Sequence, residues 1–525
     1  MERQPAQLRP APLSSAKACD LQHEVSLVRN PQRTPRSAMG AAASKNTGPL
    51  TAEARVAEFV NDRGIAALVA HARSFREGVA ENDDPIIISD AISRAPDGST
   101  IQWVQLVLAG GGVLGIAHVG FVYVLEEAGI RFLGMGGTSA GAINVGLIAA
   151  VRSDPAAVSW EETLKASPRA ILANTEFKSF EDGNSYFVEL RKSLVSKDGS
   201  VKKDISLFGK LGLVSKALLN VIAIKGAWDA MGAHPAETFR KWLTDHFVRY
   251  GVKTQEDLAA KMKLQLDTNA IYRRKDDPAP YNVAAPFEHK CADPLAESQL
   301  GQQHPLKLVT AELRTQSKIV WPEDAELFYP PFRLGQANGV GDALPKAGNT
   351  EDEKWVARVN FHGPVPPDAV FVDGGTLSNF PIALFHNFDR KPLLPTLGVQ
   401  LNVDRKDLQE IKSVPDLIGS MYNRLQSIGG GALLLTPGRA SGRGAPHLPA
   451  DALTLHLSTE LQSVDTKGFG FLDFELSPER QQELFTRGMK AAVDFLEGWR
   501  ARGDKWGKYK QLREDMAKMG KRKPA

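Results

Sequence analysis

Two short apolar runs, each ending in a cluster of glycines and each followed by a helical pattern, constrain the fold of this 525-residue chain most. Trp103–Ala109 stops at three glycines, which predicts a buried strand and a tight loop. Helical character over 116–125 leads into a second predicted strand, Phe132–Met135, and a second predicted helix, 140–151. This order implies parallel strands joined by a right-handed crossover.

Both glycine clusters are therefore expected at the carboxyl edge of one sheet, where open α/β folds bind ligands. Three later stretches continue the pattern as strands, and a closing helix over 477–499 has Ser477 as a good N-cap. The predicted strand stretches are 305–320, 369–372 and 397–403. The fold class predicted from this order is α/β with a mostly parallel sheet.

Composition narrows the class of protein. An apolar fraction of 42% and a charged fraction of 24% are typical of a soluble globular protein, and a net charge of +3 does not indicate a nucleic-acid binder. Cys19 and Cys291 are read as free thiols rather than as part of a disulfide framework or zinc site. No apolar run predicts a transmembrane helix or a signal peptide. We expect a cytoplasmic or peripheral membrane location, with secretion by a non-classical route left open.

The strongest chemical signal is Gly137-Thr138-Ser139-Ala140-Gly141. A Gly-x-Ser-x-Gly pattern between a strand and a helix is the context of a nucleophile elbow, where flanking glycines such as Gly137 and Gly141 tolerate the strained turn. The alternative is an ordinary glycine-rich strand–helix turn. We interpret Ser139 as the candidate nucleophile.

The block Gly110-Gly111-Gly112-Val113-Leu114-Gly115 has two interpretations. Its spacing fits a dinucleotide-binding loop, but that use needs an acidic residue at the end of the second strand, where Gly134–Gly137 has none. The other interpretation is an oxyanion hole, built from the backbone N–H groups of Gly110, Gly111, Gly112 and Gly115. The expected position beside Ser139 favours the oxyanion hole.

A third block, Asp373-Gly374-Gly375, follows the predicted strand that ends at Val372. Alone, Asp373 would be read as capping a turn, with Gly374 and Gly375 in the adjoining loop. A serine hydroxyl is a weak nucleophile unless a base accepts its proton, so Asp373 becomes the candidate base once Ser139 is considered.

These three blocks, in this order, resemble the patatin-like phospholipases. The resemblance is firm over about 103–151 and 368–385, and weaker through 225–228, 251–258, 308–315 and the closing helix. It implies a three-layer α/β/α fold and a Ser139–Asp373 dyad that cleaves phospholipids or related acyl esters through an acyl-enzyme. It implies neither a metal nor a nucleotide in the chemistry, and so no cofactor.

This sequence departs from the family pattern at two places. Many members have Arg or Lys where this chain has Leu114, which removes any charge assistance to the glycine loop. A Ser-x-x-Ile-Pro segment is only loosely recognisable, at 322–331 and 359–367. These departures bear on the acyl pocket and the substrate range rather than on the candidate dyad.

Histidines offer a possible third catalytic residue, but none is favoured. His118 follows the glycine loop by one helical turn, and we expect it to be packed or capping rather than catalytic. In a Ser–Asp–His triad the histidine would follow Asp373 in the chain. His386, His447 and His456 do so, but none lies in a recognisable glycine-bounded loop.

The expected organisation places the catalytic part in the middle of the chain. A helix-like pattern begins near Thr51 and extends to about Val79, and a Gly-rich stretch over 336–349 predicts a surface loop. Residues 39–44 fit an N-myristoylation pattern that would act only with Gly40 at the N-terminus; the alternative is a small-residue linker. The expected divisions are a disordered basic segment (1–50), a helical lead-in (51–100), a patatin-like domain (101–400, with a helical insertion at about 152–300), packed C-terminal elements (401–499) and a basic tail (500–525).

Contact with a membrane surface would suit lipid substrates. The stretch 207–224, with lysines in and around it, predicts either a basic amphipathic helix at a headgroup layer or a packed helix. The basic tail after Arg500 is either attracted to an anionic surface or simply disordered and solvated. Protein partners are not predicted.

Two other functions remain open from the sequence: a nucleotide-binding oxidoreductase that uses Gly110–Gly115, and an inert hydrolase-fold binding protein. The missing acidic residue argues against the first. The presence of both Ser139 and Asp373 argues against the second.

Overall fold

The computed structural model describes fifteen segments of the chain: residues 62–76, 85–95, 97–151, 177–180, 182, 236–258, 260–261, 272–273, 305–329, 344–345, 353–364, 369–385, 394–402, 461–501 and 507–511. The chain divides into the units Met1–Pro49 and Leu50–Ala525, and all described residues belong to the second. The segments 39–44 and 207–224, together with His386, His447 and His456, lie outside the described residues.

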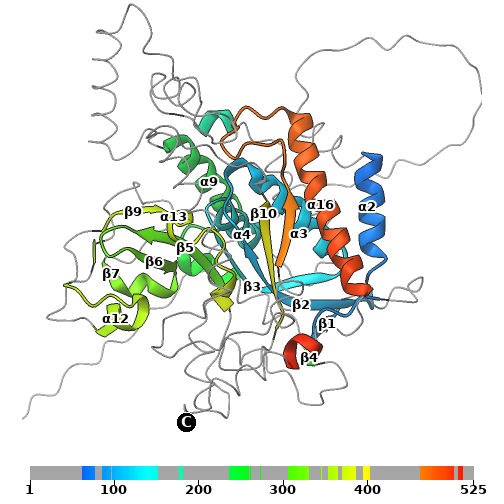
Figure 1. The fold of residues 1–525 in the computed structure, drawn as a ribbon, viewed down its shortest axis with the longest axis horizontal. Helices are drawn as coiled ribbons and strands as arrows, with labels where there is room; N and C mark the ends of the chain where they lie inside the picture. Colours follow the sequence, from blue (N-terminus) through cyan, green and yellow to red (C-terminus); the bar gives the residue numbers. More distant parts are fainter. Residues whose placement is uncertain are drawn as a thin grey trace, which may run out of the picture. The chain divides into compact units, whose positions relative to one another are not determined.

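A nine-stranded mixed sheet forms the centre of the described fold (Figure 1). Its main path has the order β11-β10-β2-β3-β5-β6, with β1 paired to β2, β4 to β1 and β9 to β5. The pairs from β11 through β5 are parallel, and those of β6, β9, β1 and β4 are antiparallel. The strands are β1 (Ala91–Arg94), β2 (Thr100–Leu108), β3 (Ile130–Thr138), β4 (Tyr272–Arg273), β5 (Leu306–Glu312), β6 (Ser317–Trp321), β9 (Phe371–Asp373), β10 (Thr396–Asn402) and β11 (Leu461–Asp465).

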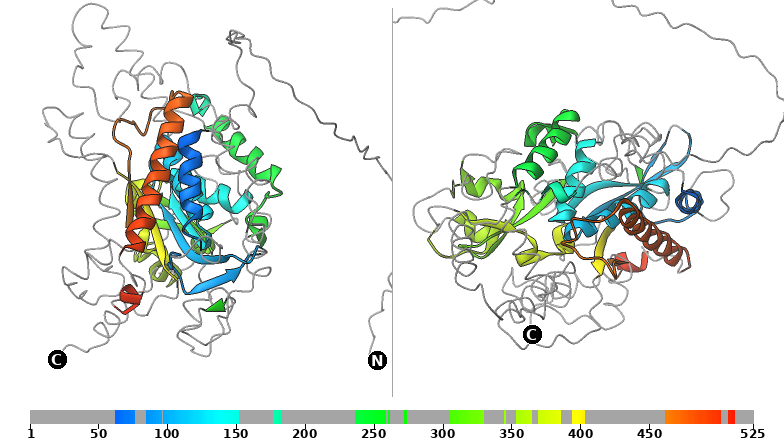
Figure 2. Two further views of the ribbon diagram at one scale, coloured as in Figure 1. Left: turned by 90° about the vertical axis from the view of Figure 1, so that its right-hand side faces the viewer. Right: turned by 90° about the horizontal axis from the view of Figure 1, so that it is seen from above.

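One face of the sheet is covered by helices. Alternate side chains of β2, at Val104, Leu106 and Leu108, join one large apolar core with side chains of the covering helices. Helix α16 lies along α3 and α2 on this side, as Figures 1 and 2 show from three directions. The longer helices are α2 (Arg63–Arg73), α3 (Gly115–Glu127), α4 (Ala140–Val151), α9 (Glu237–Arg249) and α16 (Pro478–Arg500).

The opposite face of β2 is covered differently. Val107 and Ala109 pack with Phe380, Ile382 and Phe385, which belong to the chain around the short helix η5 (Ile382–Phe385). Further short elements are η1 (Gly112–Leu114), η2 (Phe177–Phe180), η4 (Glu323–Leu327), β7 (Phe328–Tyr329), β8 (Leu344–Pro345), α12 (Glu353–Val359) and α13 (Gly375–Ser378). The prediction of an α/β fold with a mostly parallel sheet and flanking helices is confirmed.

Strand β3 is longer than predicted. The sequence indicated that it ends at Met135, whereas it continues through Gly136 and Gly137 to Thr138. The glycines serve packing here: a Cβ on Gly134 would lie 2.9 Å from the Phe385 ring, and one on Gly136 would lie 2.6 Å from Leu384. Absent side chains therefore let η5 approach the strand closely.

Several other predicted elements appear with changed limits. The helix expected from about Thr51 is described as α2, and the helical insertion expected at about 152–300 contains α9. The expected loop 336–349 contains β8, which pairs with β7. Ser477 caps α16 as predicted, accepting a hydrogen bond from the Arg480 amide.

The tail after Arg500 is not wholly the free chain that its composition indicated. Within residues 507–511, Tyr509 is fully buried and Lys510 forms an ion pair with Asp90. This part of the tail is therefore packed rather than solvated. No helix in the described segments is both long enough and apolar enough to cross a bilayer.

Candidate active site

Ser139 lies at the sharp turn between β3 and α4. Its φ of 50° is in the left-handed region, which is uncommon for a residue with a side chain and costs roughly 1–2 kcal/mol. The Ser139 carbonyl accepts the Ile143 amide 3.0 Å away, so α4 begins directly at the turn. The residue is half-buried rather than covered.

The two glycines of the elbow lie so close to neighbouring backbone atoms that neither position has room for a side chain. A Cβ on Gly137 would lie 2.5 Å from the carbonyl carbon of Gly141, and a Cβ on Gly141 would lie 2.2 Å from the Leu108 carbonyl oxygen. These contacts pack the start of α4 against the end of β2. Because β2 and β3 are parallel, with Leu108 opposite Gly137, both glycine loops leave the same edge of the sheet, as predicted.

The glycine loop that follows β2 lies against the elbow. A Cβ on Gly110 would be 3.2 Å from the Ser139 Cβ, and one on Gly115 would be 2.8 Å from the Ala140 Cβ. Gly112 has φ of 55°, a conformation that favours glycine. Both predicted blocks therefore meet at one place.

Only some of the predicted oxyanion donors are available. The Gly110 amide donates to the Asn379 carbonyl, and the Gly115 amide donates to the Gly112 carbonyl. The amides of Gly111 and Gly112 have no hydrogen-bond acceptor among the described residues. Of the four glycines predicted to line the hole, these two have N–H groups left to donate.

Asp373 lies near the same place, at the end of a strand that runs opposite to β3. Strand β6 pairs with β5 along Leu308–Glu312 and so occupies one edge of β5. Strands β3 and β9 must share the other edge: Thr138 pairs with Val309, and Asp373 pairs with the next residue, Thr310. The ends of β3 and β9 thus meet about one residue apart along β5, a spacing of ~3.3 Å.

The Asp373 carboxylate is exposed and partly engaged. Its Oδ1 accepts the Gly375 amide at 2.6 Å. A Cβ on Gly374 would lie 2.3 Å from the Val309 carbonyl oxygen, so the turn after Asp373 is pressed onto β5. The exposed side chain can therefore accept a further hydrogen bond.

Two residues that sequence reasoning did not single out join the three blocks. The Asn379 side chain donates to the Gly110 carbonyl (3.4 Å), while the Gly110 amide donates to the Asn379 carbonyl (2.9 Å). The Ser378 carbonyl accepts the Thr138 hydroxyl at 2.9 Å. Both residues follow Asp373 closely in the chain, and that proximity was the only sequence signal.

A third residue, Glu312, holds β9 in place. Its fully buried carboxylate accepts four hydrogen bonds, from the amides of Arg314, Thr315 and Val370 and from the Thr315 hydroxyl. Burial alone raises the pKa of this carboxyl, but the hydrogen bonds outweigh burial and hold the pKa below its ordinary value. The bond from Val370 fixes the residues that enter β9.

His118 is packed, as expected. It is fully buried in α3, and its ring nitrogens form no well-aligned hydrogen bond with the described residues. Burial lowers its pKa to about 3, with a smaller opposing effect from the Val399 backbone. A neutral, enclosed ring cannot exchange protons with a substrate.

The end of β3 bears on the dinucleotide alternative. The side chain at that position is that of Thr138, and its hydroxyl donates a hydrogen bond to the Ser378 carbonyl. A ribose-binding carboxylate would be needed there, and the described end of β3 does not supply one.

An α/β sheet with a serine at a strained strand–helix turn, beside a glycine loop and a strand-end aspartate, has the arrangement of an acyl hydrolase site. Residues 106–294 match the model of the patatin-like phospholipase family. This chain therefore carries a patatin-like phospholipase domain. The match includes the glycine loop and the elbow and ends before Asp373.

Curated relatives resemble the chain to different extents. An uncharacterized protein of Bacillus subtilis, YqhO, is 22% identical over 335 residues, covering 62% of this chain and 81% of YqhO. The lysophospholipases nte1 of Neurospora crassa and Emericella nidulans are 59% and 61% identical over 46 residues. Those 46 residues are 9% of this chain and 3% of each lysophospholipase.

Solved structures give distant matches. VipD from Legionella pneumophila is 14% identical, with a TM-score of 0.31 covering 80% of this chain and 72% of VipD. The type III effector protein ExoU is 15% identical, with a TM-score of 0.28 covering 81% of this chain and 58% of ExoU. The fold of this chain is defined by its own sheet order, independently of both.

Proposed function

We propose that this chain is a serine lipid acyl hydrolase that cleaves carboxylic esters of phospholipids or related lipids. Ser139 is the nucleophile and Asp373 is its base. The observation that carries the proposal is the shared edge of β5, along which the ends of β3 and β9 meet beside the glycine loop. The patatin-like phospholipase match and the short matches to lysophospholipases support lipid esters as the substrate class.

The reaction proceeds in two halves. The Ser139 oxygen attacks the acyl carbonyl while Asp373 takes the hydroxyl proton, and the oxyanion accepts hydrogen bonds from the Gly111 and Gly112 amides. The ester C–O bond then breaks, and Asp373 returns the proton to the departing alcohol. Water next gives a proton to Asp373 and attacks the acyl-enzyme carbonyl. The bond between the acyl group and the Ser139 oxygen then breaks, Asp373 returns the proton to that oxygen, and the fatty acid leaves.

Two of the features above favour catalysis without a histidine. The Asp373 carboxylate is exposed at the edge where Ser139 emerges, and the histidine nearest the glycine loop in sequence, His118, is enclosed. The proton therefore passes directly between hydroxyl and carboxylate. Phospholipids lie in bilayers, so peripheral contact with a membrane is part of the proposal.

A fluorophosphonate probe tests the nucleophile. We expect covalent labelling at Ser139, found by peptide mass spectrometry and lost in Ser139→Ala. Ser74→Ala, which changes a serine at the end of α2, is the matched control and should label like the wild type. Equal labelling of Ser139→Ala and the wild type would contradict the proposal, as would a wild type that is not labelled.

Substrate class is tested by product analysis. Purified protein is incubated with mixed phospholipid vesicles, and released fatty acids and lysolipids are measured by mass spectrometry against Ser139→Ala. Release by the wild type alone supports a lipid acyl hydrolase. A folded, probe-reactive wild type that releases no fatty acid would exclude phospholipids as substrates.

A further inference from the structure

The loop between β11 and α16, residues 466–476, reaches the glycine loop of the candidate site. The Phe471 carbonyl accepts the Val113 amide at 3.2 Å. A Cβ on Gly112 would lie only 2.2 Å from that carbonyl oxygen. The backbone at Phe471 therefore presses directly on one of the two glycines whose amides are left to donate.

Phe469 anchors this loop. Its ring is buried, and the guanidinium groups of Arg480 and Arg487, both on α16, lie 4.0 and 4.9 Å from the ring centroid. Arginine over an aromatic face is attracted by the ring quadrupole. The loop is thus fastened to α16 two residues before the carbonyl that contacts the glycine loop.

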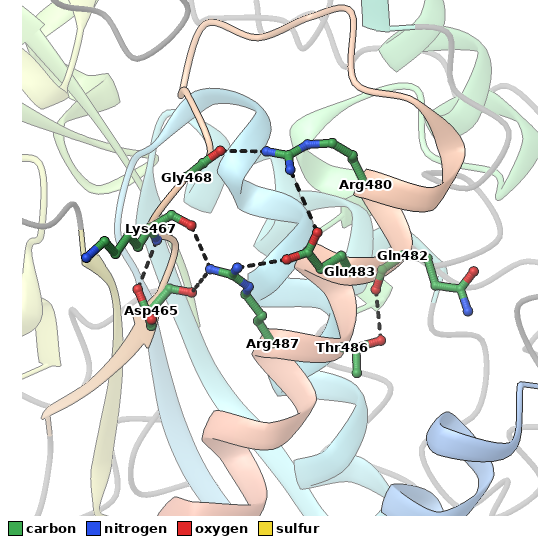
Figure 3. A network of polar contacts seen from close by, with 8 residues as sticks. All are labelled: Asp465, Lys467, Gly468, Arg480, Gln482, Glu483, Thr486 and Arg487. Atoms are coloured by element: carbon green, nitrogen blue, oxygen red, sulfur yellow. Dashed lines mark hydrogen bonds and ion pairs between the residues drawn. The ribbon is translucent and has the colours of Figure 1, made fainter.

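The same two arginines also hold the loop backbone (Figure 3). Arg480 donates to the Gly468 carbonyl at 2.5 Å, and Arg487 donates to the Lys467 carbonyl at 2.8 Å. Glu483 joins the pair, at 2.7 Å from Arg487 and 3.8 Å from Arg480. One carboxylate therefore lies within ion-pair distance of both guanidinium groups.

We propose that Arg480 and Arg487 are positioning residues for the oxyanion hole. They hold Phe469 and the backbone of 467–468, which fixes the Phe471 carbonyl. That carbonyl engages the Val113 amide and keeps the Gly111 and Gly112 amides directed to the reacting carbonyl. Neither arginine touches the substrate. This role rests on the proposed function and lies outside the segment that matches the family model.

The expected effect is on turnover. Losing one oxyanion donor outright costs about 100- to 1,000-fold in rate, and displacing donors by a fraction of an ångström costs less. Arg480 and Arg487 are partly exposed, at 43% and 30%, so their loss should leave the fold intact. We expect the double variant Arg480→Gln/Arg487→Gln to lose about tenfold in kcat, with KM nearly unchanged.

Arg500 supplies a matched control on the same helix. It also pairs with a glutamate (Glu497, 3.5 Å) and lies over an aromatic ring (Phe75, 4.5 Å), but it faces α2 rather than the loop. Arg500→Gln should keep the wild-type kcat. Arg487→Lys retains the charge without the planar fork, so it should recover only part of the loss from Arg487→Gln.

The experiment combines steady-state kinetics on a soluble fatty-acyl ester with hydrogen exchange of the peptide that contains residues 110–115. We expect faster exchange and lower kcat in the double variant, and neither change in Arg500→Gln. An active wild type together with a double variant of wild-type kcat would overturn the positioning role alone. A wild type without esterase activity would instead overturn the proposed function.

Discussion

The two halves of the candidate site are built in opposite ways. The serine half lies at the centre of the sheet, where β2 and β3 are buried along most of their length and α3, α4 and α16 cover them. The aspartate half is a three-residue strand, β9, that is half-buried and ends in an exposed carboxylate. The serine half is thus held by a large core, whereas the aspartate half depends on a few hydrogen bonds. We therefore expect the serine half to stay folded after single substitutions. We expect the geometry of the aspartate half to change when one of its hydrogen bonds is lost.

Removal of the proposed nucleophile should have the largest effect. Ser139→Ala is expected to lower kcat by about 10⁴-fold or more, since loss of a nucleophile removes covalent catalysis altogether. The core around β3 should keep the variant folded, with a circular dichroism spectrum like that of the wild type. Hydrolysis at a wild-type rate would exclude Ser139.

Removal of the proposed base, Asp373, tests the other half. Asp373→Asn keeps the size of the side chain but accepts no proton, so we expect a loss of about 10³-fold or more in kcat. Because Asp373 is exposed, the midpoint of thermal unfolding should hardly move. Substantial turnover by this variant would exclude the Ser139–Asp373 dyad.

Glu312 tests how much the aspartate half depends on one buried group. Glu312→Gln replaces acceptors of the Val370 and Thr315 hydrogen bonds with a weaker set, so β9 should loosen and kcat should fall about 10- to 100-fold. Asp324→Asn is the control, because Asp324 is also buried and accepts the hydrogen bond of a strand amide, that of Val320, but has no hydrogen bond to the described residues of β9. Equal kcat in the two variants would show that β9 does not need Glu312.

As the pH falls, the serine half should lose stability before the aspartate half does. Unfolded His118 binds a proton below its ordinary pKa of 6.5, but folded His118 does so only near 3, so the free energy of unfolding should fall as the pH drops between these values. At pH 5 the loss from this group is roughly 2 kcal/mol. The pKa of Glu312 is lowered from 4.5, so its contribution is present above that pH and is lost only at lower pH.

Denaturant unfolding at pH 7 and pH 5 measures this difference. In His118→Met, the decrease between the two pH values should shrink by about 2 kcal/mol, whereas in Glu312→Gln it should stay as in the wild type over that range. An unchanged decrease in His118→Met would show that His118 takes up a proton in the folded protein.

The smallest expected effect is a gain in stability. Glycine adopts the positive φ of residue 139 without the steric penalty of a side chain, so Ser139→Gly should raise the free energy of unfolding by roughly 1 kcal/mol over Ser139→Ala. A comparison of thermal midpoints for the two inactive variants checks this. Equal midpoints would indicate that the turn is relaxed with a side chain present.

The same contrast explains what the sequence could predict. The serine half is local: strand, glycines and helix follow one another within 103–151, so spacing alone indicated the sheet edge and the elbow. The aspartate half depends on pairing between distant segments. That β9 shares an edge of β5 with β3 follows from pairing registers that no local pattern encodes.

Roles of single backbone groups were equally out of reach. Four glycines looked equivalent as oxyanion donors, yet two of their amides are used by Asn379 and Gly112. The contact of Phe471 with Gly112 joins residues far apart in the chain. Glu312 was not singled out from the sequence, because the sequence does not reveal that its carboxylate is enclosed.

Strands β3 and β9 end next to each other on one edge of β5. The position of the Asp373 carboxylate is therefore sensitive to the number of residues that lead up to it. Side chains alternate between the two faces of a strand, so deleting or inserting one residue just before position 373 would turn the carboxylate toward the wrong face. Substitutions at 371 and 372 leave that parity intact. The register in which β9 pairs with β5 thus decides which face of the sheet the Asp373 side chain lies on.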